Sequence, residues 1–134
     1  MVDTYKSSSF EQQNAETYVA SMVEGWLGCQ MERNAKVVLS SGIHIEPDLY
    51  SEDDKIICEI FAHIGVLKVG QQHKITQDIL KMLLLEKTKG FQYRKIIVVA
   101  DDKVEKYLLG KSFIAESIRQ FGIEVKKINL SDEI

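Results

Sequence analysis

Cysteine is scarce in this sequence. Cys29 and Cys58 are the only two among 134 residues, and one cysteine pair does not make a disulfide framework. No Cys-x-x-Cys motif or cysteine and histidine spacing typical of a zinc site is present. We therefore expect two reduced thiols, with Cys58 in the hydrophobic core.

Long hydrophobic runs are also absent. No stretch approaches the roughly 20 apolar residues that a membrane-spanning helix requires. The first residues, MVDTYKSSSF, lack the basic start and the apolar segment of a signal peptide. We expect a cytoplasmic protein with no membrane partner.

Common phosphate-binding and nucleophile motifs are missing as well. The sequence contains neither G-x-x-x-x-G-K-[ST] nor G-x-G-x-x-G, and Gly110-Lys111-Ser112 lacks the upstream glycine of the first motif. We interpret Gly110-Lys111-Ser112 as a break within or between helical segments. No serine, histidine or cysteine lies in a nucleophile motif such as G-x-S-x-G, which argues against covalent catalysis.

Charge is present but unevenly distributed. The net charge of -3 gives no overall reason to expect nucleic acid. Residues 1–60 carry four basic and eleven acidic side chains (4 - 11 = -7), whereas residues 61–134 carry thirteen and nine (13 - 9 = +4). The basic half is therefore the one that could face phosphates.

Length and hydrophobic periodicity predict one domain over residues 1–134. A chain of this length with 45% hydrophobic residues can build one core but is short for two. Apolar spacing predicts helices at about 10–27, at about 71–88, and before Gly122. Runs of β-branched residues predict strands at 36–39, 43–50, 55–63, 95–100 and 123–130.

The first three strands are expected to form an antiparallel meander, and the last two a parallel pair joined by a right-handed crossover. The predicted order is αβββαβαβ, an α/β fold with a mixed central sheet flanked by helices. About residues 1–9 and 131–134 are expected to fray.

Acidic residues gather in the predicted central hairpin. If Ser51 to Asp54 form a four-residue turn, Asp48 and Glu59 are diagonal neighbours on one face and Glu46 lies opposite Glu59. Like charges repel across a strand pair, and a bound cation would remove the conflict. Carboxylate oxygens suit Mg²⁺ or Mn²⁺ better than Zn²⁺, although acids on a solvated sheet face are also ordinary.

Element order and motif together resemble the PD-(D/E)XK, or restriction-endonuclease-like, superfamily. Ile45-Glu46-Pro47-Asp48-Leu49 resembles the second strand of the family's αβββαβ core, and Cys58-Glu59-Ile60-Phe61 resembles the third. The resemblance covers about residues 10–100, and the C-terminal αβ unit extends it. It implies that Asp48 and Glu59 bind Mg²⁺ or Mn²⁺ and that Glu16 is the acid of the first helix.

The sequence departs from the family motif at one position. Phe61 stands where Glu-x-Lys has its lysine, and a phenylalanine cannot help to deprotonate a water or balance charge. Some members of the family supply this lysine from the helix after the third strand. Lys74 is the first candidate here and Lys68 the second, although Lys74 also fits an ordinary surface pair with Asp78.

Other polar side chains near the start of that helix are weaker candidates for the active site. Gln72 could hydrogen-bond a phosphate or a metal-bound water. A histidine side chain suits general acid or base catalysis, which makes His63 and His73 candidates, but histidines at such positions are more often only hydrogen-bonded.

The resemblance implies a magnesium-dependent nuclease that hydrolyses DNA, with Asp48, Glu59, Lys74, Glu16 and Gln72 at its active site. Phe61 supports an alternative, a non-catalytic nuclease fold that binds nucleic acid or protein. A nucleotide-binding domain, suggested by the run KIIVVADD, fits the meander poorly. Specific DNA interfaces bury about 1,000–2,500 Å² of protein, so a chain this small is expected to act as a homodimer, with the apolar surface of the third helix as one candidate interface.

Overall fold

The computed structural model describes residues 9–130, with side chains from Asn14 onward. The helices are α1 (Ser9–Leu27), α2 (Val69–Lys89), α3 (Asp102–Leu108) and α4 (Phe113–Gln120). The strands are β1 (Glu32–Arg33), β2 (Val37–Val38), β3 (His44–Ile45), β4 (Leu49–Ser51), β5 (Ile56–Phe61), β6 (Arg94–Val99) and β7 (Ile123–Lys127).

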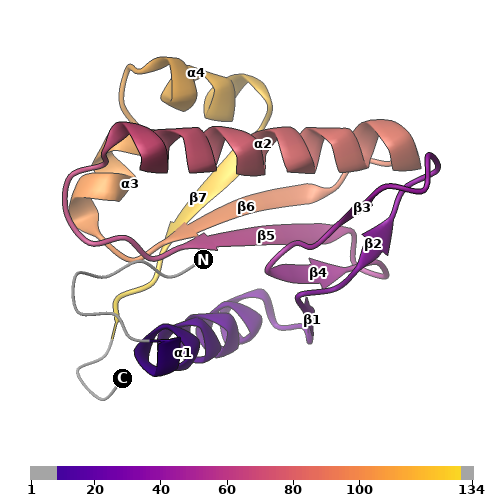
Figure 1. Ribbon diagram of the computed structural model, residues 1–134, viewed down its shortest axis with the longest axis horizontal. Helices are drawn as coiled ribbons and strands as arrows, with labels where there is room; N and C mark the ends of the chain where they lie inside the picture. The colour runs from indigo at the N-terminus through magenta and orange to yellow at the C-terminus, as the bar shows by residue number, and fades with distance from the viewer. Residues whose placement is uncertain (1–8, 131–134) are drawn as a thin grey trace.

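Five of the strands form one mixed sheet in the order β1-β4-β5-β6-β7 (Figure 1). β1 and β4, and likewise β4 and β5, pair antiparallel. β5, β6 and β7 run parallel to one another. The structure confirms the predicted α/β class with a mixed sheet and the predicted parallel pair at the C-terminal end.

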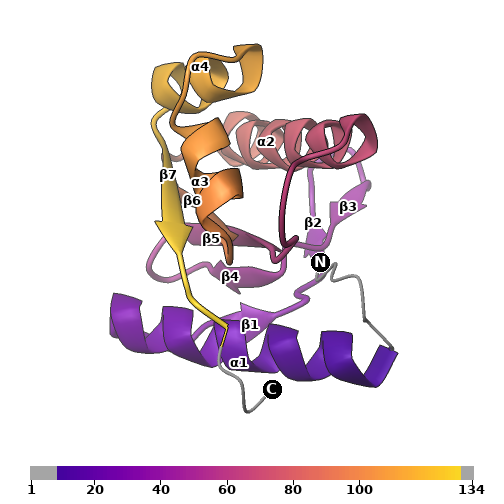
Figure 2. The same ribbon diagram turned by 90° about the vertical axis from the view of Figure 1, so that its left-hand side faces the viewer.

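Helices cover both faces of this sheet. α1 lies across one face, and α2, α3 and α4 lie on the other (Figure 2). Successive residues of β5 alternate between the two layers, so that Cys58 and Ile60 pack with the α1 residues while Ile57 and Phe61 pack with those of α2. All six residues of β5 are buried, as expected for a strand covered on both faces.

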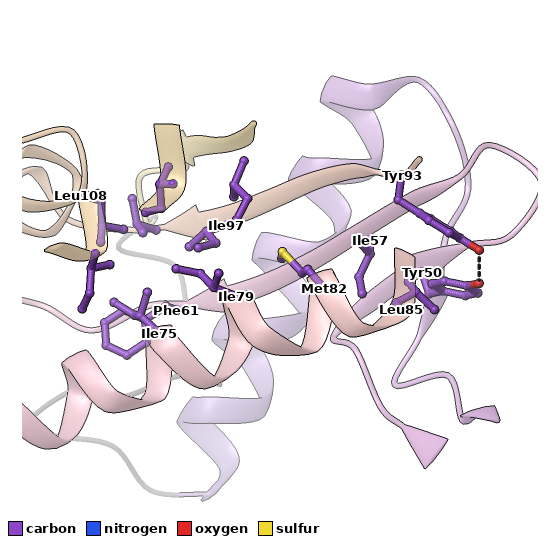
Figure 3. Packing of buried hydrophobic residues seen from close by; sticks show 14 of the residues in the cluster. Tyr50, Ile57, Phe61, Ile75, Ile79, Met82, Leu85, Tyr93, Ile97 and Leu108 are labelled. Carbon is purple, nitrogen blue, oxygen red and sulfur yellow. Dashed lines mark hydrogen bonds between the residues drawn. The ribbon is translucent and has the colours of Figure 1, made fainter. Parts of the chain in front are cut away.

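The larger core lies between the sheet and α2. Ile75, Ile79, Met82 and Leu85 recur at helical spacing along α2 and point toward Ile57 and Phe61 of β5 (Figure 3). At one end of this core the hydroxyls of Tyr50 and Tyr93 lie 3.1 Å apart. The apolar stripe of α2 therefore holds the helix along the sheet.

The helix predictions are confirmed closely. α1 and α2 begin within two residues of the predicted starts and end within one of the predicted ends. Gly28 and Gly90 follow them in the left-handed conformation, with φ of 71° and 78°, which glycine adopts without strain. The third predicted helix is two helices separated at Gly110-Lys111-Ser112, and the Ser112 hydroxyl accepts from the Ala115 amide at the start of α4.

Both antiparallel pairings of the predicted meander are present, but its middle strand is divided between them. β2 and β3 form a separate antiparallel hairpin, and the two-residue strand β1, which the sequence did not indicate, occupies the sheet edge beside β4. The predicted strand 43–50 is interrupted before β4. Pro47 lies in this interruption and has no N–H to donate to a strand partner.

The predicted register of the central hairpin is wrong. Tyr50 pairs with Ile57 rather than Lys55, and Leu49 pairs with Cys58. The turn still has four residues but lies one position later than expected, because Ser51 pairs with Ile56, and Lys55 leaves it with a φ of 56°. Continued by one residue, this register sets Asp48 directly opposite Glu59, whereas Glu46 is exposed and pairs with His44 at 3.2 Å.

Cys29 and Cys58 are both free, and Cys58 is buried, as predicted. None of the helices described is both long and apolar enough to cross a membrane. The terminal residues expected to fray, 1–8 and 131–134, lie outside the described part of the chain.

Two adjacent leucines provide a test of the core. Leu108 is fully buried, whereas Leu109 is 58% exposed. We expect Leu108→Ala to lower the free energy of unfolding by about 2–5 kcal/mol, because it removes packed methyl groups and leaves a cavity. Leu109→Ala should change it by less than about 0.5 kcal/mol. Urea unfolding measures both, and equal losses would contradict the placement of α3.

Candidate functional site

Asp48 is held between two strands just before β4. Its Oδ2 atom accepts a hydrogen bond of 2.7 Å from the amide of Ile60 in β5. Its backbone carbonyl accepts one of 3.1 Å from the amide of Asn34, which follows β1. These bonds fix the Asp48 carboxylate at the end of the sheet where the chain has just left the β2–β3 hairpin.

A hollow of about 290 Å³ lies beside Asp48. Its walls come from the N-terminal half of α1, from the end of β1 and from β5, and they include Glu16, Thr17, Arg33, Asn34 and Ile60. The structure therefore brings Glu16, the predicted acid of the first helix, to the same hollow as Asp48. Charged and polar side chains of both signs line it.

Glu59 lies on the α2 side of the sheet and is only 3% exposed. Its Oε1 atom is 3.1 Å from Nζ of Lys81, in the middle of α2. The same ammonium lies 3.7 Å from Oδ1 of Asp78, whose side chain is also buried. Two buried carboxylates therefore share the Lys81 ammonium.

The pKa values of these side chains reflect how closely the charged groups are packed. The pKa of Glu59 is raised to about 8, first by burial and then by the carboxylates of Asp48 and Asp78, against the lowering effect of Lys81. Burial likewise raises the pKa of Asp78, opposed by Lys81 and Lys74. Burial alone would lower the pKa of Lys81, but the neighbouring carboxylates reverse the direction and raise it. Three carboxylates share one close ammonium, so negative charge is in excess when all are ionised.

The donor set fits a hard divalent cation. Mg²⁺ binds carboxylate oxygens, keeps several waters and commonly uses only one or two protein carboxylates together with a substrate phosphate. Asp48 and Glu59 would supply those two carboxylates, and a cation would also offset their mutual repulsion. Over residues 9–130, no group of three or more histidine, cysteine, aspartate or glutamate side chains is arranged to hold a metal ion.

The lysine beside Glu59 is not the one the sequence suggested. Lys74 lies one turn before Asp78 and affects the pKa of that residue, whereas Lys81, seven residues further along the same helix, contacts Glu59 itself. Lys68 is the N-cap of α2. The sequence did contain one indication of this contact. Glu59 is the only charged residue in the otherwise apolar strand β5, so it requires a partner from the helix that covers the strand.

Among the other residues proposed from the sequence, His63 and Gln72 make hydrogen bonds within the fold. The ring nitrogens of His63 lie 3.0 Å from the carbonyl oxygen of Val66 and 2.8 Å from the Gln71 side-chain nitrogen, which ties the loop before α2 to the helix start. The carbonyl of Gln72 accepts from the Thr76 hydroxyl, and His73 is exposed. Neither Gln72 nor His73 lines the hollow beside Asp48.

Phe61 is fully buried and packs 5.8 Å from the ring of His63. It shares the face of β5 that carries Glu59, inside the core against α2. A lysine at this position would place an ammonium among apolar side chains. Lys81 reaches Glu59 from the helix instead and is 23% exposed.

Comparison of the chain with models of protein families, with curated proteins and with solved structures finds no match.

The Lys81 ammonium provides a stability test of this cluster. We expect Lys81→Met to lower the free energy of unfolding by about 3 kcal/mol at pH 9, where Glu59 is largely ionised in wild type, because it leaves buried carboxylates without their cation. The pKa of Glu59 is raised above its ordinary value of 4.5 to about 8, and Lys81 acts to lower it. The variant therefore keeps the Glu59 proton to a higher pH than wild type does, and the deficit should grow as the pH rises through about 8.

Urea unfolding of wild type and Lys81→Met at pH 6 and pH 9 measures the effect. Adding Glu59→Gln to Lys81→Met should recover part of the loss, because the amide carries no charge. A deficit of equal size at both pH values would show that Lys81 contributes packing rather than charge.

Proposed function

We propose that this protein is a metal-dependent nuclease of the PD-(D/E)XK type, in which Lys81 replaces the lysine missing at Phe61. One observation carries the proposal. The hairpin register sets Asp48 opposite Glu59, while α2 brings the Lys81 ammonium within 3.1 Å of the Glu59 carboxylate. Asp48 just before β4, Glu59 in β5 and Lys81 in α2 are thereby close in space, although they are distant in sequence.

Each residue has a distinct role in this proposal. Asp48 and Glu59 would hold Mg²⁺ or Mn²⁺, which when bound polarises a phosphate and lowers the pKa of a coordinated water. Lys81 would orient Glu59 and offset negative charge as the phosphate is attacked. Glu16 would hold water in the hollow that it shares with Asp48. The substrate is DNA, as the family resemblance implies.

The burial of Glu59 supports a second candidate, a non-catalytic nuclease fold that binds nucleic acid or protein. Glu59 is 3% exposed, and the hollow beside Asp48 is not lined by Glu59. A carboxylate enclosed in this way with a lysine can serve as a buried ion pair alone. In that case the three residues organise the core, and no metal binds.

Cleavage assays with matched lysine variants test the first candidate. We expect wild type with Mg²⁺ or Mn²⁺ to cut plasmid or oligonucleotide DNA, and Asp48→Ala and Glu59→Gln to lose at least about a hundredfold in rate. Lys81→Met should lose roughly a hundredfold, the scale of one charge-stabilising group. Lys74→Met, on the same helix, should retain most of the activity.

Circular dichroism would confirm that each variant is folded at the assay temperature. If wild type left duplex, nicked and single-stranded DNA intact with both metals, the catalytic proposal would be wrong. If Lys74→Met were inactive and Lys81→Met active, the assignment of the lysine would be wrong instead.

Thermal melting separates the two candidates without depending on catalysis. A ligand that binds only the folded state raises the midpoint, by an amount corresponding to about 2.7 kcal/mol when its concentration is a hundred times its Kd. We expect millimolar Mn²⁺ or Mg²⁺ to raise the midpoint of wild type by several degrees and that of Asp48→Ala by much less. No shift in wild type would favour the binding module.

A further inference from the structure

An apolar groove lies between α2 and α4. Leu80 and Leu83 of α2 form one wall, and Phe113, Ile114 and Phe121 in and beside α4 form the other. The groove has a volume of about 210 Å³. Figures 1 and 2 show α4 stacked beyond α2 at the outer surface of this layer.

The surface around this α2/α4 groove is unusually apolar. Phe113 is 81% exposed, Leu80 65%, Phe121 48% and Leu84, one turn after Leu80, 40%. Together they leave on the order of 500 Å² of hydrophobic surface in water, which matches the larger patches that mark binding sites on single chains. Protein interfaces of standard size bury about 800 Å² per partner around such a core.

The same patch carries a projecting side chain and a cavity that can receive it. Phe113 is the most exposed large hydrophobic residue among those described, and it borders the groove. A cavity of about 150 Å³ can hold benzene, so a groove of about 210 Å³ has room for a phenylalanine ring. A twofold axis beside Phe113 would place the ring of each copy against the groove of the other.

The charges beside the groove do not oppose this arrangement. Glu116 of α4 pairs with Arg119 at 2.8 Å and accepts from Gln120 at 2.7 Å. Because Glu116 and Arg119 neutralise each other within one chain, this pair presents no net charge to a second copy. Nucleic acid, by contrast, requires a surplus of basic side chains.

We propose that the α2/α4 groove is the interface of a symmetric homodimer, in which Phe113 of each copy packs into the groove of its partner. α1 and the hollow beside Asp48 lie across the sheet from α4 (Figure 2). Dimerisation therefore leaves both copies of the candidate site accessible. The interface depends on the apolar patch alone and would form whether or not the site is catalytic.

Sedimentation velocity over a range from about 1 to 200 μM, together with light scattering, tests the proposal. We expect wild type to reach twice the chain mass of 15.3 kDa as concentration rises. Phe113→Ser on α4 and Leu80→Lys on α2 should each weaken the dimer at least tenfold, because central aromatic and aliphatic anchors dominate interface affinity. Both residues are largely exposed, so both variants should keep the wild-type circular dichroism spectrum and melting midpoint when monomeric.

Ile43→Ser is the matched control. Ile43 is 63% exposed in the β2–β3 hairpin, outside the α2/α4 groove, and its replacement should leave the dimer unchanged. A wild type that stays monomeric at about 200 μM would overturn the proposal and leave the groove to a different protein. A dimer that Phe113→Ser and Leu80→Lys do not weaken would show that the copies meet elsewhere.

Discussion

The double-sided burial of β5 is the constraint on which the rest of the structure depends. A strand whose six residues are all buried must have a helix layer on each face and a hydrogen-bonded strand at each edge. α1 and α2 supply the layers, and β4 and β6 supply the edges. Glu59 lies within this strand and therefore needs a cation from the covering helix, which Lys81 provides.

The candidate site follows from this arrangement. Asp48 accepts from the amide of Ile60 in β5, and Glu59 of the same strand contacts Lys81 of α2, so both carboxylates are tied to β5. A cation bound by both would join the hollow on the α1 side to the ion pair on the α2 side. Without a bound cation, Glu59 and Lys81 would form a structural ion pair, because a carboxylate and an ammonium buried together satisfy each other.

α2 has a different function on each of its faces. Asp78 and Lys81 lie toward the sheet and form part of the charged cluster, whereas Leu80 and Leu84 remain exposed beside α4. Exposed apolar patches of this kind often mark interaction sites. The proposed homodimer through the α2/α4 groove would cover this surface and leave the opposite side of the sheet to α1 and the hollow.

Local pattern in the sequence determined the α/β class, the bounds of α1 and α2, the parallel C-terminal strands and the break at Gly110, because helical and strand periodicity are properties of neighbouring residues. It also singled out Asp48 and Glu59 through their motif. Only the tertiary structure decided the register that sets them opposite each other, the insertion of β1 at the sheet edge, and the choice of Lys81 over Lys74. The exact position of a turn and the rotation of a helix over a sheet depend on packing between distant segments, which no local pattern records.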